Sequence, residues 1–391
     1  MPWILETLTP VFIGSGQEPA SSLDFLVEPD GARLRFIPFD DLVEALADST
    51  PLMQWIEGST RPTLQDMLSQ PWAQALRTRL QAYPPLPLFT TASAPTDVAR
   101  FLQDGLRRPY IPGSSLKGAL RMALLYDFLM MQDASFFSNL LNRMDREEAQ
   151  AREKNRPFHA GSWLEQQAFR GRERDATWDL LRAIAVADTA PIRPQRFFVG
   201  EVQLVGSQRT LSIHVEALMP HCQIQIFPVR TPTDQAQALE MMQNQRRPWD
   251  ERLTTLYAQG WPVVARACYR WSQDLLAAEI DHWRWLGQQA RWQSIAQDVT
   301  SQLQALQNQN QEERPILRIG MHRGALSLTI GLAIRSHLGP NSEEYRRWAR
   351  RVVRGNRPVS DRSPKTRKAI YYQGRWWPLG WVRLGPQPEP T

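Results

Sequence analysis

The stretch PYIPGSSLKGALR combines small polar residues with two cations one helical turn apart. Gly113, Ser114 and Ser115 are residue types that open a helix, because small polar side chains accept hydrogen bonds from the first free helical N–H groups. Lys117 and Arg121 follow in the first turns, where the helix dipole disfavours positive charge. Backbone N–H groups at a helix start bind anions, and two cations would neutralise one. The pattern therefore predicts an anion-binding loop.

Two further segments have a similar composition. One is a turn near the start of the chain, formed by Gly14, Ser15 and Gly16. The other, within RIGMHRGALS, combines glycines with basic side chains: Gly320, His322, Arg323 and Gly324. A cation directly precedes Gly-Ala-Leu both here and in LKGAL, so the chain carries a short internal echo of one loop type. Two similar units that share glycine-loop chemistry would explain this echo.

The charge distribution indicates which kind of ligand. The chain has 391 residues and a formal net charge of +6, but residues 346–377 hold eleven basic residues and one acid. Arg350 and Arg354 lie in this basic segment, with Trp348, Tyr371, Tyr372, Trp376 and Trp377 interleaved. Basic side chains mixed with aromatic ones favour nucleic-acid binding, and a solvated basic face is the alternative.

Catalytic machinery is not evident. GSSLKG is not the P-loop of nucleotide triphosphatases, since no Lys-Ser/Thr follows its second glycine. The six histidines show no metal-binding spacing, and two cysteines build neither a zinc site nor a disulfide framework. We expect no cofactor, no metal and no catalytic residue. Two alternatives stay open: His322 as the general base of a metal-independent ribonuclease, and Asp24 or Asp104 in a metal-dependent one.

The elements that must position these loops alternate along the chain and predict an α+β fold. LDFLVEP and ARLRFIP indicate a hairpin, and residues 60–83 indicate helices. FFVGEVQLV and TLSIHVEALMPHCQIQIFPV indicate strands, and GWVRL a last strand. We expect domains at 1–181 and 182–391. A helical, tryptophan-rich insertion is expected at about 232–312, its tryptophans acting as packing anchors.

Hydrophobic residues make up 42% of the chain, which is typical of globular proteins, and no apolar run is long enough to span a bilayer. The first residues lack the basic start of a secretory leader. We therefore expect a cytoplasmic protein without membrane contact.

The motifs, in their order along the chain, resemble the RAMP (repeat-associated mysterious protein) superfamily of CRISPR systems. The segments that carry the likeness are LETLTPVFIGSG, PYIPGSSLKGALR, AIAVADTAPI, TLSIHVEALMPHCQI, RIGMHRGALSLTIGL and GWVRL. Within the superfamily the likeness is greatest to the fifth Csm subunits of type III-A effector complexes. This chain departs from their pattern at MHRGALS, where those subunits carry more glycine and a tryptophan.

The resemblance implies two ferredoxin-like (RRM-like) domains whose glycine-rich loops hold RNA, so the predicted anion is an RNA phosphate. It implies a non-catalytic subunit that caps the 3′-end side of the complex and aids assembly and crRNA 3′-end maturation. The implied partners are crRNA, the backbone and small subunits, target RNA and a host 3′-trimming nuclease. A ribonuclease that processes crRNA and a subunit that chiefly docks a nuclease are the alternatives.

Overall fold

The computed structural model describes most of the chain. The described residues are 3–44, 50–60, 63–91, 94–155, 162–169, 179, 181, 184–208, 211–227, 229, 260–353 and 358–386. Arg354 and residues 232–259 of the expected insertion lie outside them.

Runs of strands are followed by runs of helices through the described residues, as is typical of an α+β fold. The strands are β1 (Trp3–Thr7), β2 (Ala20–Ser21), β3 (Phe25–Val27), β4 (Arg33–Phe36), β5 (Leu86–Phe89), β6 (Asp97–Ala99), β7 (Phe197–Val205), β8 (Ser212–Leu218), β9 (Gln223–Ile226), β10 (Ile316–Arg318), β11 (Arg367–Tyr372), β12 (Arg375–Trp377) and β13 (Trp381–Pro386). The α-helices are α1 (Phe39–Glu44), α2 (Thr50–Gly58), α3 (Leu64–Ser69), α4 (Gln74–Leu80), α5 (Gly113–Met130), α6 (Ala134–Glu153), α7 (Ser162–Phe169), α10 (Trp261–Leu286), α11 (Gln293–Gln309), α12 (Gly331–Leu338) and α13 (Glu343–Val352).

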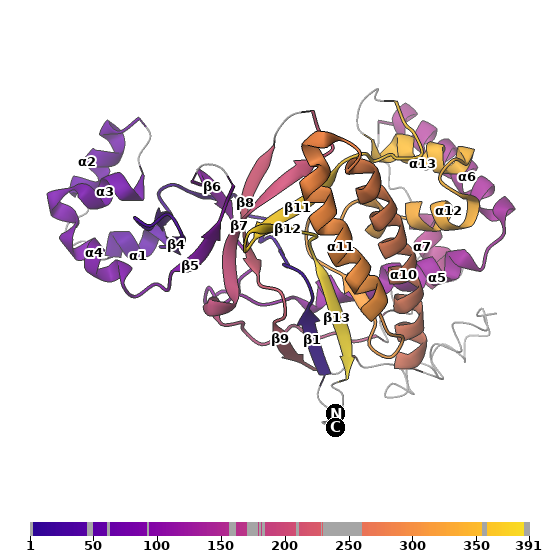
Figure 1. Cartoon of the computed structure of the whole chain (residues 1–391), viewed down its shortest axis with the longest axis horizontal. Coiled ribbons are helices and arrows are strands. Elements are labelled where there is room, and N and C mark those ends of the chain that lie inside the picture. The colour runs from indigo at the N-terminus through magenta and orange to yellow at the C-terminus, as the bar shows by residue number, and fades with distance from the viewer. Residues whose placement is uncertain are drawn as a thin grey trace.

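A four-stranded antiparallel sheet brings the two ends of the described chain together. Its order is β10-β13-β1-β9. Trp3 of β1 lies opposite Pro386 of β13 and, on the other side, opposite Ile226 of β9. The first and last described strands, β1 and β13, therefore lie side by side (Figure 1).

A larger sheet has the order β2-β6-β8-β7-β5-β4-β3 and forks at β7. The antiparallel pair β7–β8 forms its centre, with β5 parallel to the start of β7 and β6 parallel to β8. The end of β7 pairs instead with β11, which continues into β12. The strands expected within FFVGEVQLV, TLSIHVEALMPHCQIQIFPV and GWVRL are thereby confirmed as β7, as β8 with β9, and as β13.

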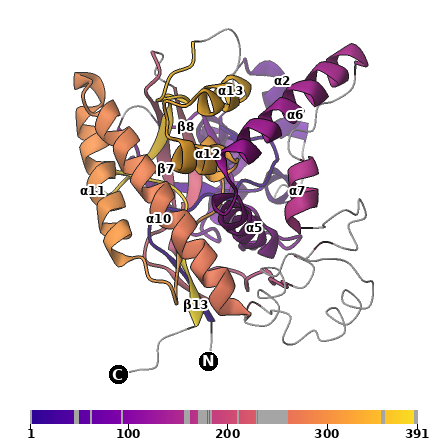
Figure 2. The same ribbon diagram turned by 90° about the vertical axis from the view of Figure 1, so that its right-hand side faces the viewer.

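Helices α10 and α11 form a layer against the sheets, and α10 also packs against α5 (Figure 2). Three of the tryptophans assigned to packing are buried here: Trp271, Trp283 and Trp292. The helical character of the insertion is thus confirmed for 261–309. Because α10 contacts α5 and β10, this region is an integral layer of the core rather than a peripheral addition.

A small lobe of α1 to α4 with the β3–β4 hairpin projects from the rest of the molecule (Figure 1). The hairpin is the one expected from the sequence, with Phe25 opposite Phe36. The helices predicted at 60–83 are α3 and α4, separated by a short 3₁₀ turn. The lobe has its own apolar core, which includes Leu42, Leu52 and Leu76.

Strand pairing crosses the boundary expected after residue 181. The N-terminal β1 is a central strand of a sheet whose other members follow residue 222, while β7 and β8 complete a sheet begun by β2 to β6. The division at 181 stays a prediction, but neither residues 1–181 nor residues 182–391 contain all the strands of either sheet. Among the described residues no helix is both long and apolar enough to cross a bilayer.

Candidate RNA-binding site

The three glycine-containing loops are connected by adjacent backbone segments. The Met321 N–H donates to the Phe12 carbonyl oxygen at 2.8 Å, and the Leu102 N–H donates to Ile13 at 2.8 Å. The Tyr110 N–H donates to Leu102 at 3.4 Å. Segments far apart in the sequence therefore lie side by side. The loops at 14–16, 113–117 and 320–324 extend from these connected segments, and we call the three loops together the platform.

The first and third loops are in direct contact at Gly14 and Gly320. A Cβ on Gly14 would lie 2.3 Å from the Met321 sulfur, and one on Gly320 would lie 2.3 Å from the Phe12 carbonyl oxygen. Gly320 also has a φ of +79°, which L side chains rarely adopt. Ser15 stays at the exposed side, where its N–H donates to the Arg100 carbonyl at 3.4 Å. The two loops thus form one continuous surface.

The start of α5 is held by a carboxylate of the chain itself. The Gly113 N–H donates to Asp188 Oδ1 at 2.7 Å, and a Cβ on Gly113 would lie 2.2 Å from the Val186 carbonyl oxygen. Asp188 belongs to the AIAVADTAPI segment, whose Thr189 N–H donates to Ile111 at 3.0 Å. One of the anion-binding positions expected at this helix start is therefore already filled. Ser114 is exposed and Ser115 half-buried beside it.

Lys117 and Arg121 differ in their surroundings. Arg121 Nη1 lies 3.2 Å from a buried Asp179 carboxylate, and its guanidinium stacks 4.5 Å from the Phe169 ring centre. No hydrogen bond or ion pair within the described residues engages Lys117, whose ammonium is half-buried. Burial lowers the pKa of Lys117, Asp179 opposes that effect, and Arg121 adds to it. Of the two cations, Lys117 is the better placed to meet a ligand.

The backbone of the loop at 320–324 has several residues with positive φ. Positive φ recurs at alternate residues: +79° at Gly320, +67° at His322 and +80° at Gly324. No acceptor for the N–H groups of 322, 323 and 324 occurs among the described residues. Alternating backbone conformations with unpaired N–H groups create concavities that bind anions.

The side chain of His322 faces another basic residue. Lys368 Nζ lies 2.8 Å from His322 Nδ1, and the imidazole stacks on Phe12 with ring centres 5.8 Å apart. Burial lowers the pKa of His322 to about 4, and the nearby Lys368 cation contributes. The imidazole is therefore neutral at pH 7.

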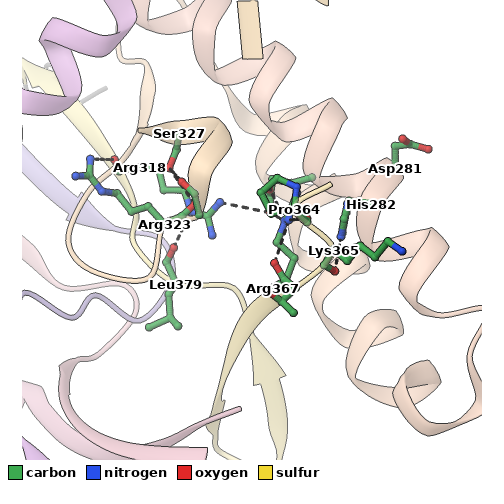
Figure 3. A network of polar contacts seen from close by, with 12 residues as sticks. Asp281, His282, Arg318, Arg323, Ser327, Pro364, Lys365, Arg367 and Leu379 are labelled. Carbon is green, nitrogen blue, oxygen red and sulfur yellow. Dashed lines mark hydrogen bonds and ion pairs between the residues drawn. The ribbon is translucent and has the colours of Figure 1, made fainter. Parts of the chain in front are cut away.

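Arg323 points toward the interior, where a buried ionic network supports the loop (Figure 3). Its Nη1 donates to the Arg318 carbonyl oxygen at 3.3 Å. Arg318 Nη1 lies 3.4 Å from the buried Glu279 of α10, and Arg367 Nε donates to both Glu279 oxygens at 2.9 and 3.0 Å. Burial, followed by the charge of Arg318, lowers the pKa of Arg323 to about 10. The network ties β10, β11 and α10 together directly below the loop.

Several arginines of the basic segment 346–377 form ion pairs within the chain. Arg347 and Arg351 on α13 both pair with Asp145 of α6. Arg350 is exposed and lies 3.2 Å from Glu343. The aromatic residues expected to contribute to nucleic-acid binding are mostly core residues, because Trp348, Tyr372, Trp376 and Trp377 are buried. These four rings pack in the interior of the protein.

The residues considered for catalysis make contacts that are typical of structural residues. An imidazole with a pKa of about 4 is unprotonated at neutral pH and too weak a base for efficient proton transfer. Asp24 closes a turn by accepting from the Ser21 N–H and hydroxyl, both at 2.8 Å. Asp104 accepts from the backbone N–H groups of Leu106 and Arg108, both at 2.9 Å. No cluster of three metal-ligating side chains occurs in the part of the chain that the structure describes.

Comparison with known proteins identifies the family. The sequence profile of the RAMP superfamily matches residues 4–293, well over half of the chain. The chain belongs to the RAMP superfamily. This RAMP protein is 28% identical over 150 residues to the CRISPR system Cms protein Csm5 of Streptococcus thermophilus, a match that covers 37% of each chain. The matched part of the chain spans only 37% of the length of this curated relative.

Two solved structures share the fold of this RAMP protein over nearly its whole length. One is a chain of a Csm-crRNA-target RNA ternary complex of a type III-A CRISPR-Cas system, with a TM-score of 0.65, 20% identity and coverage of 98% of this chain and 99% of the other. The second is T. onnurineus Csm5, with a TM-score of 0.66, 20% identity and coverage of 97% and 99%.

Sequence reasoning missed two residues of this site. Asp188 lies in a motif that was recognised, but nothing in its type indicated that it would cap α5. Lys368 is one of four lysines among 46 basic residues, a rarity that could have singled it out. Its contact with His322 depends on β11 lying beside the loop, a pairing that no local pattern reveals.

Proposed function

We propose that this RAMP protein is a non-catalytic crRNA-binding subunit of a type III-A CRISPR effector complex. It caps the 3′-end side of the assembly and aids crRNA 3′-end maturation. Its partners are crRNA, target RNA, the backbone and small subunits of the complex, and a host nuclease that trims the 3′ end. The proposal includes two ferredoxin-like units as the basis of the fold and the cytoplasm as its location.

The observation that carries the proposal is the shared platform of the three loops. Segments 12–14, 101–103, 109–111 and 320–321 are joined by backbone hydrogen bonds or bridges, which supports the proposal that the loops face a ligand as one surface. Among the described residues, the N–H groups of 322–324 and the ammonium of Lys117 have no hydrogen-bond partner, and they supply donors without base-specific groups. Such a surface suits a sugar–phosphate backbone, whose contacts position a nucleic acid without reading its sequence.

The likeness to Csm5 supports the place in the assembly. The matching fold extends over the whole chain, and one of the matching chains comes from a complex that contains crRNA and target RNA. The weak basicity of His322 and the turn-closing contacts of Asp24 and Asp104 favour binding over cleavage.

Sequencing of RNA retained by the complex tests the proposal. The tagged chain is co-expressed with its neighbouring genes and a CRISPR array, with an omission strain as the control. We expect short RNAs with a common repeat-derived 5′ tag, and 3′ ends that shift when the chain is omitted. Intact complexes with unchanged 3′ ends in its absence would contradict the capping role.

A further inference from the structure

A cluster of basic side chains below the loop at 320–324 lacks a carboxylate. Lys368 projects from β11 toward His322, and Arg323 is the next residue of the same loop. Within the described residues, no acid forms an ion pair with Lys368 or Arg323. By contrast, the neighbouring Arg367 has Glu279 as its partner. The cluster therefore holds positive charge that the chain does not compensate.

The hydrogen bond between Lys368 and His322 fixes the protonation of the imidazole. An ammonium group can only donate, so His322 Nδ1 must accept and the ring proton must lie on Nε2. Nε2 is buried and has no acceptor among the residues that the structure describes, and the same holds for the Nε of Arg323. Donors outnumber acceptors in this cluster, so the missing group is an acceptor.

Burying the Lys368 ammonium without a counter-charge costs folding free energy. Burial lowers the pKa of Lys368, and no nearby carboxylate raises it again. Unpaired buried charges are retained where a ligand compensates them, since their desolvation otherwise opposes folding. The unpaired N–H groups of 322–324 face the same requirement. An anion with several oxygen acceptors would satisfy both.

We propose that Lys368 is a phosphate-binding residue of the RNA site. Its ammonium and the backbone N–H groups of residues 322–324 hold one phosphodiester of the bound RNA, with His322 accepting from the ammonium and orienting it. Arg323 contributes positive charge from below, because its guanidinium is directed toward Arg318. This inference rests on the proposed RNA-binding function and adds a residue outside the three loops to it.

Binding of labelled single-stranded crRNA to the full-length chain, at several salt concentrations, tests the assignment. Lys368→Met removes the charge and keeps the length of the side chain, and Lys368→Arg restores the charge. Lys365→Met is the matched control, because Lys365 is exposed three residues earlier. We expect Lys368→Met to weaken binding about tenfold, as loss of one charge-assisted contact does. The salt slope should fall by about 0.7, the value for one phosphate of a single strand.

The remaining outcomes separate this inference from the proposed function. Lys368→Arg should recover most of the salt slope, and Lys365→Met should retain it. A structural role alone would instead lower the unfolding temperature of Lys368→Met and leave the salt slope of the folded fraction unchanged, which would overturn the assignment. If the unaltered chain bound no RNA, both the proposed function and this inference would fail. If it bound and Lys368→Met bound equally, only the inference would fail.

Discussion

Individual glycines in this protein occur for different structural reasons, and the atoms around each glycine show which reason applies. A Cβ on Gly113 would lie 2.2 Å from the Val186 carbonyl oxygen and 2.8 Å from the Ala187 carbonyl carbon. A Cβ on Gly118, five residues along the same helix, would meet nothing within 4 Å. The sequence showed both as glycines of one motif, yet only Gly113 allows the backbone at 186–187 to approach α5.

The substitutions Gly113→Ala and Gly118→Ala should therefore have opposite effects on stability. We expect Gly113→Ala to lower the free energy of unfolding by about 1–3 kcal/mol, because the backbone at 186–187 must move away. Gly118→Ala should raise it by about 0.5–1 kcal/mol, since alanine is the better helix former. Urea-induced unfolding of both variants measures this difference. Equal destabilisation by the two would contradict the role assigned to Gly113.

Asp188 illustrates what residue types alone do not disclose. The sequence predicted an anion at the start of α5, and the structure places a carboxylate of the chain against the Gly113 N–H. The two are linked by a sequence separation of 75 residues, which no local spacing could reveal.

At the scale of elements, the two cations of α5 have different roles. Arg121 stabilises the structure, and Lys117 is available to a ligand. Arg121 packs on Phe169 and pairs with Asp179, so it joins the helix to the segments around it. Lys117, one turn earlier, has no such pair among the described residues. The local pattern correctly indicated a helix and a cationic face, but it could not separate the two roles because the partners come from distant segments.

Lys117→Ala and Arg121→Ala should differ in salt dependence. We expect Lys117→Ala to reduce the slope of RNA affinity against salt by about 0.7, the contribution of one phosphate. Arg121→Ala should leave the slope nearly unchanged and lower the free energy of unfolding by about 1–3 kcal/mol, because Asp179 would keep a buried charge without this partner. Salt titration and urea unfolding of each variant test both statements. A reduced slope in Arg121→Ala would show that its guanidinium contacts RNA.

At the scale of the whole molecule, the strand types were predictable and their partners were not. Alternating apolar residues identified β7, β8 and β13, and the hairpin at 25–36 followed from its turn. The pairing of β1 with β9 and β13 joins residues more than two hundred positions apart. Such pairing depends on the global topology. No local sequence pattern therefore showed that strand pairing crosses the expected division after residue 181.

Fragments cut at that boundary should not fold independently. Residues 182–391 lack β1, which is the central strand between β9 and β13, and residues 1–181 lack β7 and β8. We expect each fragment alone to be largely unfolded and protease-sensitive, and co-expression of the two to restore a folded complex. Circular dichroism and limited proteolysis measure this. A stably folded 182–391 fragment would support the two-domain division instead.

The platform of the three loops is the central claim, and cross-linking tests it most directly. The complex is assembled with crRNA that contains 4-thiouridine, irradiated, and digested for mass spectrometry of the cross-linked peptides. We predict cross-links in peptides that contain residues 14–16, 113–117 and 320–324. Cross-links confined to the small lobe or to α13, with none in these three loops, would contradict the account.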